Sequence, residues 1–482
     1  MVICNTNCKT GSLMLPKGSV GEPVIYEGSD DDVVLRLYRA VESYDLEDNG
    51  GRRLECCLLL EEMASLWLLW TQGIPDRLSH KVDLIATTPD DLLAKEVLVK
   101  LPGRENRFPA LDRMPVQYGS QQTVHLVLFG SSQLAEALAV NAALVAHYPN
   151  YTRDTRLRTR ITIVDDGASP LHDRLLRRYV HLFENSYYRL INLDDRDPKP
   201  FVHHPIYEGR RMDFVDVEWE FVSGNVGNEV LRQKLTEWSM SDRQQLTLAL
   251  CYGNIGQNIE TALSMPEAVY TNHIPIFCHT AKRGLLALAT ECDRCNSVVP
   301  FGYEQSCLDT LFTLKQMAKM VNYVYARCFA LGPDEQMTAP AHFEDKAVEE
   351  AWGNLDSFAD QYSNFCNAMA LGAKMHSAGL ATDDWQSYYA LSRDEIVQLS
   401  EVEHNRWSVE KLLMGFRPVT DEEQQTVEKD VAQKTCLKRK RVHYDLRAFS
   451  DLRNDASGKN ANVYDMALTQ SIPLIIKTCI TD

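Results

Sequence analysis

The sequence predicts an α/β fold whose main part is a doubly wound parallel sheet, and three observations lead to this prediction. Residues 123–129 (TVHLVLF) form a short apolar run rich in β-branched and aromatic residues, as in a strand buried on both faces. Similar runs recur at 160–164, 213–222, 245–252, 273–279 and 297–301, and most are followed by helical spacing. Residues 391–482 instead show mainly helical spacing, which predicts a separate C-terminal module.

The stretch from Gln122 to Ala146 predicts the opening of a Rossmann-like nucleotide-binding domain. A glycine at position 130 permits a sharp turn after the strand, and the free N–H groups at the start of the next helix attract a phosphate. We therefore expect a dinucleotide to contact five consecutive residues, Gly130, Ser131, Ser132, Gln133 and Leu134. Against the fingerprint G-x-G-x-x-G, serine replaces the second glycine and alanine the third. The serine either hydrogen-bonds a phosphate or crowds it out. The alternative is therefore a Rossmann scaffold that has lost its nucleotide site.

Acidic residues follow the next predicted strand. Asp165 and Asp166 come directly after residues 160–164, where a carboxylate usually holds the ribose hydroxyls of a dinucleotide. The spacing from Gly130 exceeds the usual ~20 residues, which predicts an insertion, YPNYTRDTRLRT, between helix and strand. The alternative is that Asp165 caps the next helix together with Gly167.

Small polar residues follow the later strands. The loop after 213–222 begins Ser223-Gly224-Asn225, and the loop after 245–252 begins with Gly253 and Asn254. Because loops after parallel strands gather at one edge of a sheet, we place Gly253 and Asn254 beside the nucleotide. Turn chemistry explains Gly and Asn equally well.

The N-terminal residues predict a small α/β region. Asp30 to Asp32 start a helix that includes Val33 to Ala40, and residues 81–87 alternate as a strand. Residues 89–91 then begin a helix that runs to about residue 101. Leu54 to Trp70 (LECCLLLEEMASLWLLW) is interpreted as one buried helix, with an interfacial or partner helix as the alternative. Residues 102–121, rich in Pro and Gly, are expected to be a linker. The predicted domains are 1–118, 119–305, a helical connector 306–390, and 391–482.

Composition narrows the class of protein. The formal net charge of −17 argues against nonspecific binding to nucleic acid or to an anionic membrane. No stretch reaches the roughly 18 apolar residues of a membrane helix. The thirteen cysteines lack framework spacing and no secretory signal is visible, so we expect reduced thiols in the cytoplasm. Cys292 and Cys295 form a lone C-x-x-C without a second pair, and no metal site is predicted.

The C-terminal module contains the most specific sequence motif in the chain, LSEVEHNRWSVEKLLMGF at residues 399–416. Its helix begins at Ser392, with Glu395 at the spacing of a capping box. On this helix His404, Trp407 and Lys411 share one face. A tryptophan there can stack on a base, while histidine and lysine can meet a phosphate. The alternative is that Trp407 anchors a small helical core. The run from Lys438 to Arg441 is expected to be solvated, with an anion-binding patch as the alternative.

Two resemblances follow from these residues. Residues 123–304, with Ser223-Gly224-Asn225 leading into a short helix, resemble the RCK/KTN domains of potassium-uptake regulators, which bind NAD(H) or another adenine nucleotide without chemistry. Residues 391–480 resemble the ryanodine-receptor (RyR) repeat domain of prokaryotic proteins. The resemblance rests on the motif at 399–416 and on three later segments, His443 to Leu446, Phe449 to Leu452 and Tyr464-Asp465. The second resemblance implies a ligand-binding set comprising Glu403, His404, Arg406, Trp407 and Lys411.

Together the resemblances imply a cytoplasmic, ligand-responsive regulator in signalling or antiviral defence. We expect a homodimer that binds NAD or a related adenine nucleotide, and a nucleotide-derived signal at the RyR-like module. The sequence does not determine whether a membrane channel is a partner of the protein. Two other functions were weighed. An NAD(P)-dependent oxidoreductase needs a proton donor such as a Tyr–Lys pair, and none is well placed in the sequence. An interaction scaffold with an empty Rossmann domain is favoured by Ser132.

Overall fold

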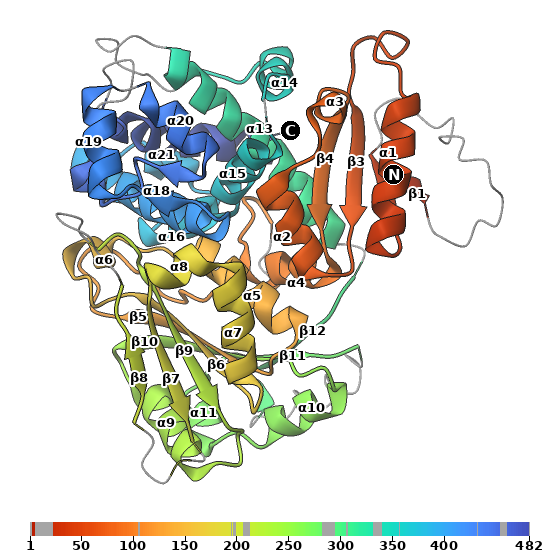
Figure 1. The fold of residues 1–482 in the computed structure, drawn as a ribbon. Helices are drawn as coiled ribbons and strands as arrows, with labels where there is room; N and C mark the ends of the chain where they lie inside the picture. The colour runs from red at the N-terminus through yellow and green to blue at the C-terminus, as the bar shows by residue number, and fades with distance from the viewer. Residues whose placement is uncertain are drawn as a thin grey trace.

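We describe the protein from a computed structural model (Figure 1). The structure describes residues 2–4, 23–104, 107–193, 195, 199–205, 213–281, 295–304, 307–330, 340–355, 357–430, 432–453 and 460–481. It is a mixed α/β structure with a large, mostly parallel eight-stranded sheet, a second parallel sheet near the N-terminus, and a helical C-terminal region.

The N-terminal region forms a four-stranded sheet in which all neighbouring strands are parallel. Its strands follow the chain in the order β1 (Val2–Cys4), β2 (Val24–Glu27), β3 (Leu54–Leu59) and β4 (Val82–Thr87). The helices of this region are α1 (Asp30–Ser43), α2 (Met63–Gln72), α3 (Asp76–Ser79) and α4 (Pro89–Leu98). The predicted helix at 30–40, the strand at 81–87 and the helix after Pro89 are confirmed.

The prediction of one helix from Leu54 to Trp70 is wrong. The run LECCLL is the strand β3, and the helix α2 begins only at Met63, after a break at Glu61 and Glu62. A strand between two parallel neighbours is buried along its length, so its sequence reads as a continuous apolar run that periodicity cannot distinguish from a buried helix.

The eight-stranded sheet has the order β12-β11-β10-β5-β6-β9-β7-β8. Neighbouring strands are parallel except β8, which is antiparallel to β7 at the edge. The bounds are β5 (Thr123–Phe129), β6 (Thr159–Val164), β7 (Tyr187–Asn192), β8 (Phe201–His203), β9 (Val217–Ser223), β10 (Gln244–Leu250), β11 (Ile276–His279) and β12 (Val298–Phe301). The six strands expected from the sequence are present, whereas β7 and β8 were not predicted.

Alternate residues of each central strand belong to two different cores. In β5, Leu126 and Leu128 join the larger hydrophobic cluster, while Val127 and Phe129 join a second cluster on the other face. The larger cluster includes residues of α5 (Gln133–Val145), α7 (Ala168–Arg178) and α8 (Val180–Glu184). The second includes residues of α9 (Glu229–Met240), α10 (Ile255–Leu263) and α11 (Glu267–Thr271). The short helix α6 (Asn150–Arg153) lies in the predicted insertion.

The C-terminal region is a helical assembly that packs on both sheets' helices (Figure 1). Its elements are α13 (Cys307–Ala330), α14 (Asp345–Gly353), α15 (Phe358–Met369), α16 (Leu371–Ser377), α17 (Trp385–Tyr388), α18 (Arg393–Leu413), β13 (Arg417–Pro418), α19 (Asp421–Lys429), α20 (Gln433–Arg439), β14 (Val442–His443), the 3-10 turn η2 (Phe449–Asp451) and α21 (Asn462–Thr481). The capping box predicted at Ser392 and Glu395 is confirmed at the start of α18.

Helix α5 lies at the centre of the molecule. Every residue from Leu134 to Val145 is buried, and the helix packs against α4, α15 and α18. The Asn141 side chain donates to Asp91 of α4, 2.9 Å away, inside this packing. One continuous hydrophobic cluster therefore extends from Val24 to Ile476, across all the predicted domain boundaries.

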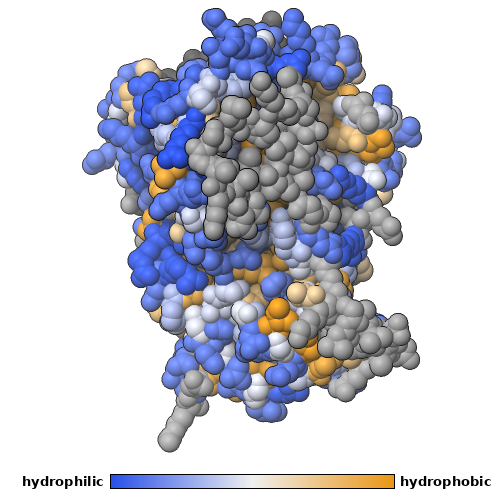
Figure 2. Space-filling model, turned by 90° about the vertical axis from the view of Figure 1, so that its right-hand side faces the viewer, coloured by the Kyte–Doolittle hydropathy of each residue, from blue (hydrophilic) through white to orange (hydrophobic). Residues whose placement is uncertain are grey.

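The surface view (Figure 2) shows how polar and hydrophobic residues are distributed on one face. Figure 2 shows a mainly hydrophilic face with several small, separate hydrophobic areas. Within the described residues, no helix is both long enough and apolar enough to cross a bilayer.

Candidate functional site

The candidate site lies where the direction of strand order changes. From β5 the chain continues to β6 on one side, whereas β10, the other neighbour of β5, leads to β11 and β12 on the opposite side. In open parallel sheets, ligands bind beyond the carboxyl ends of the two strands that flank such a point. The loops there are Gly130 to Gln133 after β5, and Cys251 to Asn254 after β10.

Gly130 is required by the contact between these two loops. It has φ of 110°, and a Cβ built there would lie 2.8 Å from backbone atoms of Cys251 and Tyr252. Residues other than glycine rarely adopt this φ, so the backbone conformation requires glycine whether or not a ligand binds. The sharp turn predicted at Gly130 is confirmed, and the close backbone packing is a sufficient reason for the glycine, whereas its contact with a dinucleotide stays a prediction.

Ser132 joins the loops through its hydroxyl. The Oγ donates to the carbonyl oxygen of Cys251 at 2.5 Å and accepts from the N–H of Ala135 at 3.3 Å, so it is the N-cap of α5. Ser131, Ser132 and Gln133 are half-buried, and Leu134 is buried. The serine that departs from the dinucleotide fingerprint therefore has a structural role.

Asp165 connects the end of β6 to the same loop. Its Oδ1 accepts from the N–H of Gly167 at 2.6 Å and from the Ser131 hydroxyl at 3.0 Å. Gly167 is the N-cap residue of α7, and no side chain among the described residues caps this helix, so Asp165 contacts the residue at the helix start without being the cap itself. Asp166 beside it is exposed. Contact of either aspartate with a ribose stays a prediction.

The buried side chain of Asn258 fixes the backbone of the loop after β10. Its amide oxygen accepts from the N–H of Tyr252 at 2.9 Å, and its amide nitrogen donates to the carbonyls of Tyr252 and His279. Asn254 caps α10 by accepting from the N–H of Gly256. Gly253 is exposed, and a Cβ there would meet no atom within 4 Å. Gly253 is therefore an exposed position in a loop whose neighbouring backbone is held by Asn258.

Arg174 is a basic residue at this site that the sequence reasoning missed. On α7, its Nη2 donates to the Ser131 carbonyl at 3.4 Å, and its Nε lies 3.6 Å from Oε2 of the buried Glu136. Arg178, one turn further along, also pairs with Glu136. Burial raises the pKa of Glu136, while Arg178 and Arg174 oppose that rise. The signal in the sequence was the i, i+4 spacing of the two arginines, which puts both on one helix face.

The N-terminal sheet presents its own carboxyl edge to α5. The backbone N–H of Met63, where α2 begins, donates to Oε1 of Gln133 at 2.9 Å. The pKa of Asp90, after β4, is raised by burial and by the nearby Asp91 and Glu62. The buried Cys251 thiol also has a pKa well above its usual value, from burial first and then from Asp90. The N-terminal region, in which the sequence suggested no chemistry, thus borders the candidate site.

The predicted ligand residues of the C-terminal module lie mostly in the core. Arg406 donates to Glu403 at 2.8 to 3.1 Å and to Glu410 at 2.8 Å, and Lys374 of α16 pairs with Glu403. These side chains are at most 2% exposed. Burial raises the pKa of Glu403, but Arg406 and Lys374 outweigh it and hold that pKa well below its usual range. Each charge in the cluster is therefore satisfied by another part of the protein.

His404 and Lys411 are also buried. His404 Nε2 lies 2.8 Å from the Arg447 carbonyl, and its Nδ1 lies 3.2 Å from the Asp465 carboxylate. Because a carbonyl only accepts, Nε2 carries a hydrogen. Lys411 lies 3.0 Å from Glu410 and donates to Ser363.

Trp407 is the one member of the predicted set that is partly exposed. Its ring is stacked on His404, with ring centroids 5.5 Å apart, and meets the edge of His443 at 4.8 Å. The Lys411 ammonium lies 5.9 Å from its ring centroid. The core-anchor interpretation describes these contacts, and ligand binding at Trp407 stays a prediction.

No group of three or more His, Cys, Asp or Glu side chains in the described part of the chain could hold a metal ion. Of the C-x-x-C pair, Cys292 lies outside the described residues, and Cys295 is a half-buried free thiol.

Comparisons of the chain with protein-family models, with curated proteins and with solved structures gave no match.

Proposed function

We propose that the protein is a nucleotide-responsive regulator that binds a dinucleotide, NAD or a related adenine nucleotide, at the candidate site between β5 and β10. The observation that carries the proposal is the strand order β9-β6-β5-β10-β11-β12. When the outer strands β7 and β8 are set aside, this corresponds to the order 3-2-1-4-5-6 of Rossmann domains, with the change of direction at the predicted phosphate loop. The pyrophosphate would lie at the start of α5, near the exposed Gly253 and the half-buried Arg174.

A regulatory role is supported by the position of α5. This helix begins at the candidate site and is buried against α4 of the N-terminal region and against α15 and α18 of the C-terminal region. A ligand bound at its first turn would stabilise the arrangement of all three parts. A change of shape elsewhere requires that the ligand favour one arrangement over another.

A second ligand at the C-terminal module belongs to the same proposal, through the resemblance to RyR-like modules. Its contact surface would be Trp407 with the neighbouring Phe416 and His443, because the charged members of the predicted set are buried and paired. Trp407→Leu should then weaken binding of a nucleotide-derived ligand without changing binding at the first site.

An empty scaffold is the second candidate function. The Ser132 hydroxyl is engaged by Cys251, and Asp165 Oδ1 by Ser131 and Gly167, so polar groups that a ligand would use already satisfy one another. This observation favours an interaction protein whose sheet binds no nucleotide.

Calorimetric titration of the full chain, cleared of copurified ligand, with NAD, NADH, ADP-ribose and ATP tests both candidates. We expect one of these to bind, Arg174→Gln to weaken binding about 10-fold, the loss of roughly one charge-assisted hydrogen bond, and Gly253→Leu to block it sterically. Gly253→Leu is preferable to a bulky residue at 130, because the latter would collide with the backbone of Cys251. Arg177→Gln, at an exposed position of the same helix, is the matched control.

No binding of any of the four ligands would overturn the dinucleotide proposal and leave the scaffold. Equal weakening by Arg174→Gln and Arg177→Gln would show that the ligand responds to overall charge rather than to this site.

A further inference from the structure

A cavity lies away from the candidate site, at the junction of the predicted linker and the C-terminal helices. Its volume is about 450 Å³, within the ~300–1,000 Å³ range of small-molecule sites. It is lined by Lys100, which follows α4, by residues 107–110 and 113 of the predicted linker, and by His376 of α16. Four of the seven lining residues are Lys, Arg or His, in a chain whose formal net charge is −17.

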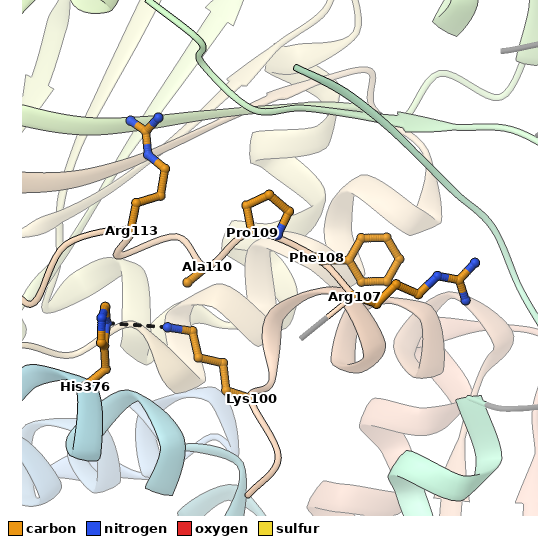
Figure 3. Close-up of a pocket in the computed structure, with 7 residues that line it drawn as sticks. All are labelled: Lys100, Arg107, Phe108, Pro109, Ala110, Arg113 and His376. Carbon is orange, nitrogen blue, oxygen red and sulfur yellow. Dashed lines mark hydrogen bonds between the residues drawn. The ribbon is translucent and has the colours of Figure 1, made fainter. Parts of the chain in front are cut away.

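One buried carboxylate orients two of the basic groups. Asp112 is 3% exposed, its Oδ1 lies 3.3 Å from Lys100 Nζ, and its Oδ2 lies 2.8 Å from His376 Nδ1. Lys100 Nζ and His376 Nδ1 are themselves 3.4 Å apart, and Figure 3 shows the two side chains pointing toward each other at the cavity. Since lysine has three N–H donors, Asp112 leaves donors of Lys100 for another acceptor.

The position of Lys100 is fixed by backbone packing. Gly372, at the start of α16, lies so close that a Cβ there would collide with the Lys100 carbonyl oxygen and side chain. Lys100 and His376 therefore come from segments that touch directly, and their separation does not depend on flexible side chains alone. Such preorganisation lowers the cost of binding an anion.

The remaining arginines stand at the two ends of the 107–113 segment (Figure 3). Arg113 is exposed, and its Nη1 lies 3.4 Å from the His273 carbonyl. Arg107 is also exposed and pairs with Glu304 at 2.6 Å. Asp112 accounts for the placement of Lys100 and His376 as a structural ion cluster. Arg113 lines the same cavity but is not part of that cluster.

We propose that this cavity is a binding site for a small phosphate-bearing molecule, held by Lys100, Arg113 and His376. Lys100 and His376 meet at Asp112, and Arg113 lines the same cavity with its guanidinium pointing away from that pair (Figure 3). Several N–H donors along one cavity suit the multiple acceptor oxygens of a phosphate-bearing molecule better than a single carboxylate. The bound anion would interact with the positive charges of Lys100 and Arg113, and it would tie the linker to α16.

Pyrophosphate is the probe for the test, with inorganic phosphate and malonate as comparison anions, in calorimetry on the full chain at about 0.15 M salt to limit diffuse charge effects. We expect pyrophosphate to bind more tightly than malonate. Arg113→Gln should weaken pyrophosphate binding at least 10-fold, and Lys100→Met likewise. The matched control is Arg104→Gln, which removes the same charge from an exposed residue of the same segment that bonds Thr313 and does not line the cavity.

Pyrophosphate could also bind at the start of α5, so Arg174→Gln is included. Loss in Arg174→Gln with full binding in Arg113→Gln would overturn the cavity site, as would an equal loss in Arg113→Gln and Arg104→Gln. Tighter binding of malonate than pyrophosphate would overturn the phosphate assignment, and no heat with any anion would overturn the site. Because Lys100 contacts the buried Asp112, the result for Arg113→Gln decides if Lys100→Met fails to fold.

Discussion

At the scale of single residues, Gly130 is the position at which the sheet edge tolerates no side chain. The ideal Cβ at this position falls 2.8 Å from the backbone of both Cys251 and Tyr252, and φ is 110°. We expect Gly130→Ala to destabilise the protein by about 3 kcal/mol, from backbone strain and overpacking together. Urea unfolding measures the loss, and Gly253→Ala, at an exposed glycine with open space, should stay within about 0.5 kcal/mol of the wild type. Similar losses in both variants would contradict the proposed reason.

The His404–Asp465 pair predicts a pH dependence. Burial lowers the pKa of His404, but Asp465 and the Arg447 carbonyl outweigh burial, so the pKa is raised above 6.5. The stabilisation is then fully present below pH 6.5 and is lost as the pH rises through the pKa of the folded state. Burial raises the pKa of Asp465, and His404 opposes this rise. A raised carboxyl pKa also makes stability fall as the pH rises, so Asp465 changes stability in the same direction as His404. The other titratable groups near the pair include Asp445 and His443.

We therefore expect His404→Gln to cost more stability at pH 6 than at pH 9. Urea midpoints of the variant and the wild type at both pH values give the difference, in which groups common to the two proteins cancel. An identical cost at both pH values would show that His404 contributes through packing and hydrogen bonding alone.

At the scale of elements, α18 is joined to α16 through buried charges rather than through apolar contacts alone. Glu403 of α18 is shared by Arg406 on the same helix and Lys374 on α16. Glu403→Gln would leave both cations with one fewer opposing charge in a site without solvent. We expect a loss of about 3–5 kcal/mol in the free energy of unfolding, measured by urea titration.

Glu42→Gln provides the comparison for this network. Glu42 pairs with Arg77 at 3.1 Å, but its side chain is 55% exposed, so its loss should cost at most about 1 kcal/mol. A loss for Glu403→Gln as small as that for Glu42→Gln would show that water or a neighbouring group compensates the buried cations.

Some helices and strands can be predicted from neighbouring residues alone, and others cannot. The strand at 123–129, the helix after it and the capping box at Ser392 are each specified by neighbouring residues, and all three are confirmed. Leu54 to Trp70 was wrongly predicted because a short apolar run is consistent with either state. The strand β8 is three residues long and its first two residues are exposed, so it carries no burial pattern that a sequence could display.

At the scale of the whole molecule, the N-terminal region is not independent of the rest. Asp91 of α4 is 1% exposed and accepts from Asn141 of α5, and Lys95, also of α4, lines an inner cavity with Trp352 and Phe358. Removal of residues 1–118 would expose the α5 face and leave Asn141 without this partner. A protein of residues 119–482 should therefore aggregate or lose cooperative unfolding, as followed by light scattering and thermal melting. A monomeric fragment with the melting temperature of the full chain would contradict this prediction.

The sequence alone determined the strands of the large sheet that carry local burial patterns, the turn at Gly130, and the amphipathic C-terminal helices, because these depend on residues close together in the chain. It also found the loops at the sheet edge, since parallel strands bring their carboxyl ends to one side. Only the tertiary structure decided that Ser132 bonds Cys251 and that Arg406 is buried with Glu403. It also decided that Arg174 reaches the loop after β5 and that Lys100 and Arg113 line one cavity. Those roles depend on partners distant in sequence, and a charged residue reads the same in sequence whether its partner lies in the core or in solvent.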